Sequence, residues 1–314
     1  MKINNQENTS SIYDFDLLEM FSFFYKRKKI IISFTGIGLA LSIVYALTLK
    51  NVYTSEALVS VYDQGESDTN ISSIFQQASQ LAGFAGISLP SSGSNKSDYL
   101  VEVLQSKEFV KHISTLEGVK ENIIAAEKYE NNSKTIIYDN SLYDVNSSSW
   151  IREPTKIRGV IPSYIELDEV IRKKLKILKD PDTNFIRIKF EHISPIYAAE
   201  FLETIIKECD DNLRIMDMQR SETFLEYLNN MLSKTSDQEL RSTINNLIKN
   251  QIEIQMLGSV KEYYFLNIID PPHIPEKKSY PNRASICIIG LILSFMISII
   301  YILFRDILFL KRKS

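Results

Sequence analysis

Residues 195–257 read PIYAAEFLETIIKECDDNLRIMDMQRSETFLEYLNNMLSKTSDQELRSTINNLIKNQIEIQML, and after Pro195 this stretch contains neither proline nor glycine. Proline suits the first turn of a helix, where its missing N–H is not needed. Apolar residues then recur at spacings of 3, 4, 4 and 3, at Leu202, Ile205, Cys209, Leu213 and Met216. This period predicts a long amphipathic helix.

The segment Ser233–Glu239, SKTSDQE, interrupts the helical pattern. Ser236 and Glu239 have the spacing of a capping box, in which the two side chains satisfy backbone donors at the start of a helix. We therefore expect two helices, over about 195–233 and 237–258, joined by a tight turn. One continuous helical rod is the alternative.

The apolar stripe of the first helix continues through Leu225 and Leu228 with coiled-coil-like spacing. At 1.5 Å per residue this helix would be roughly 58 Å long. Such an arm cannot bury its stripe alone, so we expect neighbouring copies of the chain to cover it in a closed ring. Leu225 and Leu228 are therefore candidate contact residues.

Shorter elements are expected on the N-terminal side of the arm and just after it. Alternation rich in Val, Ile and Tyr predicts strands at Val52–Tyr62, Leu175–Leu178, Phe185–Glu191 and Lys261–Ile269. Helical spacing predicts helices over Asp98–Ile113, Glu117–Glu130 and 163–174, the last with a capping box at Ser163 and Glu166. Residues 131–162 are expected to be irregular.

A proline-rich connector follows the last predicted strand. Residues 270–281 read DPPHIPEKKSYP and hold four of the nine prolines, namely Pro271, Pro272, Pro275 and Pro281. Proline fixes φ and lacks a backbone donor, so this segment is expected to be stiff and extended. The segment is either a strut between the sheet and the next helix or a stretch whose prolines only end the strand.

Two charge-free runs, Ile30–Leu49 and Ala284–Phe304, are each long enough to cross a bilayer. A signal peptide or a buried core helix are the alternatives for the first run. Eight basic residues flank the outer ends of the two runs, and four flank the inner ends. This asymmetry predicts transmembrane helices with both termini in the cytoplasm.

Two further features concern the membrane. Gly36 and Ala40 form a small-xxx-small pair on one face of the first run, a pattern that allows close helix packing within or between protomers. Asp14–Tyr25 has apolar residues at helical spacing and predicts an interfacial helix, with a contact for a cytoplasmic or membrane partner as the alternative.

The chemistry of the loop between the two runs points away from catalysis. Lys50–Arg283 contains 27 basic and 34 acidic residues, so it would not attract nucleic acid. Cys209 is its lone cysteine, so no disulfide forms within it. The three histidines, His112, His192 and His273, have no ligand-spaced partners. We expect no catalytic set, metal or cofactor, and hence a scaffold or binding protein.

Several stretches resemble Wzz-type chain-length determinants, the polysaccharide co-polymerases of bacterial inner membranes. Near the N-terminus these are DLLEMFSFFYKRKKIII and VYTSEALVSV, followed by SIFQQASQLAGFAGI and DYLVEVLQSKEFVKHI. FLEYLNNMLSKTSDQELRSTINNLIKNQIEIQMLGSVKEYYFLNIIDPPHIPEKKSYPNRA resembles the family's C-terminal signature. The region 120–162 is the least distinctive.

The resemblance implies a non-enzymatic regulator in the form of a ring of identical protomers on the periplasmic face. It implies a role in setting the modal length of lipid-linked O-antigen made by a Wzy-type polymerase. One alternative is a capsule or exopolysaccharide co-polymerase that works with a separate tyrosine kinase, since the ten-residue C-terminal tail leaves no room for a fused one. A two-span extracytoplasmic receptor and an anchored extracytoplasmic enzyme are the others.

The expected fold is an α+β membrane protein in which two transmembrane helices flank a periplasmic domain with a membrane-proximal α/β base and a long helical hairpin arm. The expected segments are a cytoplasmic tail (1–29), transmembrane helix 1 (30–49), the periplasmic α/β base (50–194), the helical arm (195–258), the return strand with the proline-rich connector (259–283), transmembrane helix 2 (284–304) and a second cytoplasmic tail (305–314).

Overall fold

The computed structural model describes residues 25, 27–61 and 96–311. The chain forms two compact units, residues 1–50 with 281–314 and residues 51–280, and each unit is described by itself. The apolar segment at 74–87 lies outside the described residues, as does the interfacial helix expected at Asp14–Tyr25 except for Tyr25 itself.

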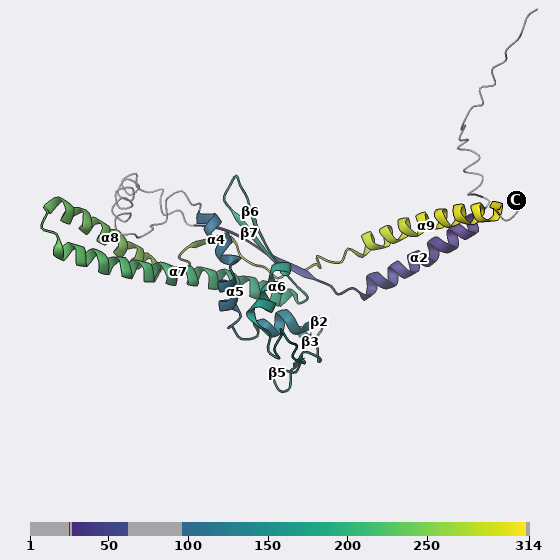
Figure 1. Ribbon diagram of the computed structural model, residues 1–314, viewed down its shortest axis with the longest axis horizontal. Coiled ribbons are helices and arrows are strands. Elements are labelled where there is room, and N and C mark those ends of the chain that lie inside the picture. The colour runs from purple at the N-terminus through teal and green to yellow at the C-terminus, as the bar shows by residue number, and fades with distance from the viewer. Residues whose placement is uncertain (1–24, 26, 62–95, 312–314) are drawn as a thin grey trace, which may run out of the picture. The chain divides into compact units, whose positions relative to one another are not determined.

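The first unit is a pair of antiparallel helices, α2 (Lys28–Thr48) and α9 (Arg283–Lys311), which lie side by side (Figure 1). Phe34 stacks on Tyr301 with ring centroids 5.0 Å apart, and the Ser42 hydroxyl donates to the carbonyl of Ile286 at 3.0 Å. Both helices are long and apolar enough to cross a membrane; α9 contains the second predicted apolar run, and α2 contains the first except for its last residue, Leu49.

The second unit holds the remaining helices and strands. In chain order they are β1 (Tyr53–Val61), α4 (Lys96–Leu104), α5 (Lys107–Ile113), η1 (Glu121–Ala125), β2 (Ala126–Glu130), β3 (Thr135–Tyr138), β4 (Tyr143–Asp144), β5 (Ser149–Trp150), α6 (Tyr164–Lys174), β6 (Leu175–Lys179), β7 (Ile186–His192), α7 (Pro195–Lys234), α8 (Gln238–Val260) and β8 (Leu266–Asp270).

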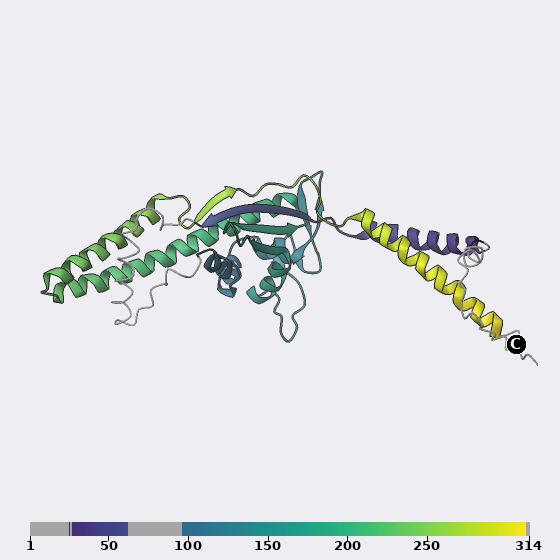
Figure 2. The same ribbon diagram turned by 90° about the horizontal axis from the view of Figure 1, so that it is seen from above.

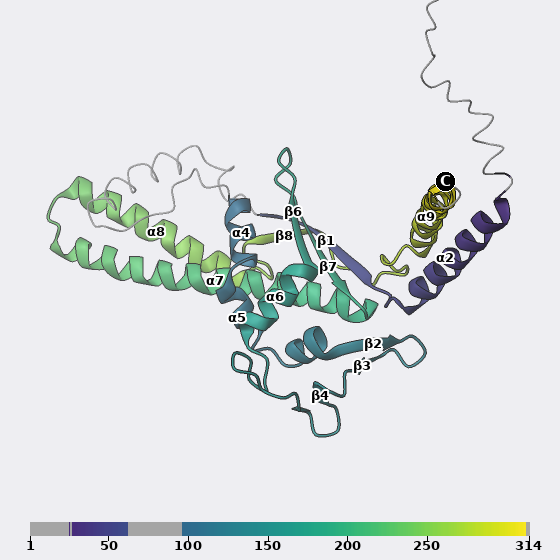
Figure 3. The same ribbon diagram turned by 45° about the vertical axis from the view of Figure 1, so that its right-hand side comes forward.

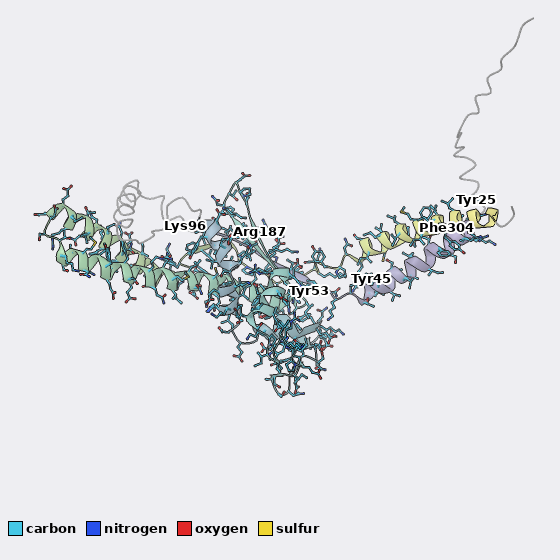
Figure 4. The ribbon with its side chains drawn as sticks, in the orientation of Figure 1. Tyr25, Tyr45, Tyr53, Lys96, Arg187 and Phe304 are labelled. Carbon is cyan, nitrogen blue, oxygen red and sulfur yellow. The ribbon has the colours of Figure 1, made fainter. Side chains whose placement is uncertain are left out.

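An antiparallel four-stranded sheet in the order β6-β7-β1-β8 organises this unit (Figure 3). Ile186, Ile188 and Phe190 of β7 share one fully buried face, as their alternation predicts. The opposite face is charged, because Glu56 on β1 accepts from Arg187 and Lys189 on β7. Arg187 is labelled on this sheet in Figure 4.

The buried face of the sheet packs against the first half of α7 (Figure 2). This half of α7 is buried on a broad face that includes Phe201, Leu202, Ile205, Ile206 and Leu213. Residues from α4, α5 and α6 complete the same hydrophobic core. The strand β1, which follows the first apolar helix along the chain, pairs with β8, which precedes the second.

The second half of α7 forms a hairpin with α8, so the two-helix prediction is confirmed and the continuous rod is wrong (Figure 1). The cap differs from the prediction. Asp237 Oδ1 accepts from the backbone N–H groups of Glu239 and Leu240, at 2.9 and 3.1 Å, and α8 begins at Gln238. Asp237, rather than Ser236, is thus the residue that caps α8.

Three predictions for the segment between β1 and β6 differ from the structure. The helix expected over Asp98–Ile113 is two helices, because Ser106 caps a new one by accepting from the N–H of Phe109. The helix expected over Glu117–Glu130 is a π-helical turn followed by β2, whose pairing with β3 overrides its helix propensity. The segment 131–162 is not wholly irregular, since it contains β3, β4 and β5.

Candidate functional site

The proline-rich connector lies alongside the first residues of β1. The β1–β8 ladder reaches the pair Leu58 and Asp270, and the prolines that follow cannot donate backbone hydrogen bonds. A side chain holds the chain instead, because the buried Ser55 hydroxyl donates to the carbonyl of His273 at 2.8 Å. The connector thus stays against β1 without a regular ladder.

A short backbone bridge closes the far end of the connector. Val52 N–H donates to the carbonyl of Tyr280 at 3.0 Å, and Ser279 N–H donates to the carbonyl of Val52 at 2.8 Å. Of the predicted site residues here, Pro271 is exposed, whereas Pro272, Pro275 and Pro281 are half-buried. The bridge fixes both chain segments of this unit that lead to the two apolar helices.

Asp210 joins α7 to the start of β8, and the sequence did not identify it. Its fully buried carboxylate accepts from three successive backbone N–H groups, those of Tyr264, Phe265 and Leu266, at 2.7 to 2.8 Å. These N–H groups therefore do not enter a ladder, which explains why β8 begins at Leu266 and not at Lys261. The available signal was an acidic residue between Cys209 and Leu213 on the apolar stripe.

Arg214 lies one helical turn further along α7. Together with Asp210 it forms what we call the latch between α7 and the start of β8. Its guanidinium lies 3.3 Å from the Asp210 carboxylate and donates to the carbonyl of Glu262 at 2.6 Å. A buried carboxylate is costly unless it is paired and hydrogen-bonded, and here both conditions hold. Asp210 and Arg214 thus fix where the chain returns from the hairpin to the sheet.

The hairpin has a small core of its own. Leu228 packs against Ile244 and Leu247 of α8 and is 3% exposed, whereas Leu225 is half-buried. The second helix of the hairpin therefore covers Leu228, which the sequence assigned to contact with a neighbouring copy. Large apolar side chains remain exposed along the hairpin, namely Ile215, Met216, Tyr227, Ile252, Met256 and Val260.

The close contact between α2 and α9 uses small residues other than the predicted pair. A Cβ added at Gly38 would collide with Ser294, and one added at Gly290 would collide with Ser42. Gly36 has open space around it, and both Gly36 and Ala40 are exposed. Gly36 and Ala40 therefore do not pack against α9. The signal for the real contact was two other small-xxx-small pairs, Gly38–Ser42 and Gly290–Ser294.

The buried His192 and the half-buried Lys174 hold the η1 turn in place. His192 Nε2 lies 2.8 Å from the carbonyl of Asn122, and Lys174 Nζ donates to the carbonyl of Ile123 at 3.1 Å. Burial lowers the pKa of Lys174 to about 8. Burial, with a smaller effect of the Lys174 charge, lowers the pKa of His192 to about 4.

His192 and Cys209 of the second unit have structural roles. His192 Nδ1 accepts from the N–H of Ser194 at 3.1 Å, so both ring nitrogens are occupied. Burial raises the pKa of the Cys209 thiol, which keeps it protonated and unreactive. Among the described residues, no group of three or more His, Cys, Asp or Glu side chains is placed to hold a metal ion.

One family model matches part of the chain. The family model described as chain length determinant protein (Wzz) matches residues 13–116, and no curated protein matches. Solved structures that match include a full-length bacterial polysaccharide co-polymerase, with 14% identity, a TM-score of 0.40, and coverage of 93% of this chain and 98% of that one. A fragment of WzzB, a polysaccharide co-polymerase from Salmonella Typhimurium, matches with 9% identity, a TM-score of 0.30, and coverage of 73% and 100%. The family match confirms the resemblance predicted from the sequence: over residues 13–116 the chain is similar to Wzz-type chain length determinants.

Proposed function

We propose that this chain regulates the length of a bacterial surface polysaccharide without catalysing its synthesis. The observation that carries the proposal is the match of residues 13–116 to the chain length determinant family, a stretch that includes α2, β1, α4 and α5. The occupied His192 and the unreactive Cys209 are in keeping with a scaffold.

We further propose a two-span topology in the bacterial inner membrane. The helices α2 and α9 cross the bilayer, both termini are cytoplasmic, and the loop 50–283 is periplasmic. The eight-to-four excess of basic residues at the outer ends of the apolar runs supports this orientation. A reporter fused at Ser314 should behave as cytoplasmic and one at Gly93 as periplasmic. A periplasmic C-terminus would contradict the topology.

The proposed active form is a homo-oligomeric ring. The hairpin exposes apolar side chains such as Met216, Tyr227 and Met256, which neighbouring copies would cover. The ring would hold lipid-linked O-antigen and its Wzy-type polymerase in a fixed arrangement, and that arrangement would determine the length of the polymer. The full-length protein solubilised in detergent should therefore have a mass several times that of the 36.2 kDa chain.

A gel ladder of lipopolysaccharide tests the function directly. Deletion of the chain should leave polymerisation running with short, unregulated products. The pair Pro272→Ala and Pro275→Ala should shift the modal length, because it loosens the connector that lies along β1. Pro181→Ala, in the exposed β6–β7 turn, is the matched control and should leave the ladder unchanged.

A catalyst would fail differently from a scaffold. Removal of one essential group of an enzyme abolishes product, whereas a scaffold variant broadens or moves the length distribution. Single substitutions of carboxylates and histidines between residues 50 and 283 should therefore never abolish polymer. A single carboxylate that proves essential for any polymer would overturn the regulator.

A further inference from the structure

The end of the connector combines aromatic, aliphatic and basic side chains on its exposed surface. Tyr280 and Ile274 are each 54% exposed, and Lys277 and Lys278 between them are also exposed. The large apolar area of Tyr280 is left in solvent although its backbone is fixed by Val52. Exposed Tyr and Lys side chains together are typical of residues at a membrane–water interface.

Chain connectivity places this surface close to the ends of both apolar helices. Val52 follows the end of α2 at Thr48 by four residues, and Tyr280 precedes the start of α9 at Arg283 by three. Three extended residues span at most about 11 Å. Each headgroup layer is roughly 5–8 Å thick. If α9 crosses a bilayer, Tyr280 must lie within or just above the headgroups.

The charge around this junction has the opposite sign to the rest of the loop. Glu276 is the one acidic residue between Pro271 and Arg283, against Lys277, Lys278 and Arg283. The loop as a whole has 34 acidic and 27 basic residues. Basic residues are therefore concentrated where the chain meets the helices, which complements phosphate-bearing headgroups.

We propose that the end of the connector is a lipid-binding anchor. Tyr280 and Ile274 insert at the headgroup boundary, and Lys277 and Lys278 bind the anionic headgroups of the adjacent leaflet. The anchor rests on the two-span topology of the proposed function but not on chain-length control. Its consequence for that function is that the end of the connector is held at the bilayer surface.

Single-tryptophan fluorescence in lipid nanodiscs tests the anchor on the full-length chain. Trp150 is the only tryptophan and is changed to Phe, which keeps an aromatic ring against Tyr143. Tyr280→Trp is the reporter in this background. Leu41→Trp, in the middle of α2, marks the hydrocarbon layer, and Ile157→Trp, at a side chain that is 96% exposed, marks water.

The reporter at position 280 should be quenched by lipids brominated near the headgroup and protected from aqueous iodide. Quenching of this reporter by iodide to the extent seen at position 157, without quenching by bromolipid, would overturn the anchor while position 41 stays lipid-quenched. Absence of quenching at position 41 by lipids brominated deep in the acyl chain would overturn the span of α2 and with it the anchor. If the reporter at position 280 is lipid-quenched as expected but deletion of the chain leaves the lipopolysaccharide ladder unchanged, the anchor stands and the proposed regulatory function is contradicted.

The anionic specificity is tested by comparing brominated phosphatidylglycerol with brominated phosphatidylcholine. Each basic residue near an anionic surface contributes roughly a fivefold preference before screening by salt. We expect the anionic lipid to quench the reporter at position 280 at least about twofold more strongly. Lys277→Gln with Lys278→Gln should remove that difference, whereas the exposed pair Lys156→Gln and Lys173→Gln should keep it. Equal quenching by both lipids in the parent would overturn the headgroup contact.

Discussion

The two halves of α7 have the same helical period but very different surroundings. The first half, up to Leu213, packs against the sheet and shares with it and the helices α4, α5 and α6 a core of more than twenty buried residues. Among the described residues, the second half packs mainly against α8, around Leu228, Ile244 and Leu247. This difference shows that periodic apolar residues identify which face of a helix is buried, but not how many other helices and strands pack against that face.

The comparison has a direct consequence for local stability. Opening free energy rises with the buried apolar contact that a segment loses. The base, defined here as the sheet with the first half of α7, should therefore open rarely, and the hairpin of α7 and α8 should open often. Hydrogen exchange of detergent-solubilised protein, resolved by segment, measures the two regions in one experiment.

The largest expected effect comes from matched leucines in the two halves. Leu202→Ala should destabilise the base by about 3–4 kcal/mol, because Leu202 is fully buried in a core that cannot collapse around the cavity. Leu228→Ala should cost about 2 kcal/mol, since two helices can close around a smaller side chain. Equal losses of exchange protection in the two variants would contradict the comparison.

Asp210→Asn should cost the base about 2–3 kcal/mol. An amide offers one acceptor where the carboxylate offers two, and its NH₂ group would face the backbone donors of Tyr264, Phe265 or Leu266. Faster exchange should be confined to β8 and the residues before it. Asp211→Asn is the control, because its half-exposed carboxylate lies 3.5 Å from Arg214 and binds no buried donor. Equal effects of the two variants would rule out the latch.

The stability of the base should depend on pH through Lys174. Its folded pKa of about 8 lies below its ordinary 10.5, so the unfolded chain binds more protons between these values. Stability of the base should therefore rise by roughly 2–3 kcal/mol from pH 8 to pH 10.5 and be flat in this respect below pH 8. Lys174→Met should abolish this slope, and Lys173→Met, on the exposed side of α6, should keep it. A slope of equal size in the hairpin would contradict the assignment.

Most of the helices and strands in the two units were predictable because one periodic face decides them. The alternation in β7 and the spacing in α7 each correspond to a buried stripe in the structure. The π-helical turn and β2 were not predictable, since their conformation depends on pairing with β3 and on carbonyl contacts with His192 and Lys174. His192 and Lys174 lie far along the chain, and β3, although it begins only five residues after β2, shows no strand pattern strong enough to outweigh the helical spacing.

The candidate site divides in the same way. The composition of the connector identified its prolines. That Ser55 binds the connector could be seen only once the register of β1 was known. Two small-residue patterns in the first apolar run were equivalent in sequence, and the position of α9 selects Gly38 over Gly36. Asp210 was missed because its partners are backbone groups, which leave no trace in side-chain pattern.

The smallest expected effect concerns the turn of the hairpin. Asp237→Ala should destabilise the hairpin by about 1 kcal/mol, because it removes the acceptor of two N–H groups at the start of α8. Ser236→Ala should change its stability by less than about 0.5 kcal/mol, since the structure assigns the cap to Asp237. Neither substitution should change the stability of the base, because Leu228 and its partners lie between the turn and the large core. Faster exchange in α8 after Ser236→Ala, with none after Asp237→Ala, would restore the capping box that the sequence predicts.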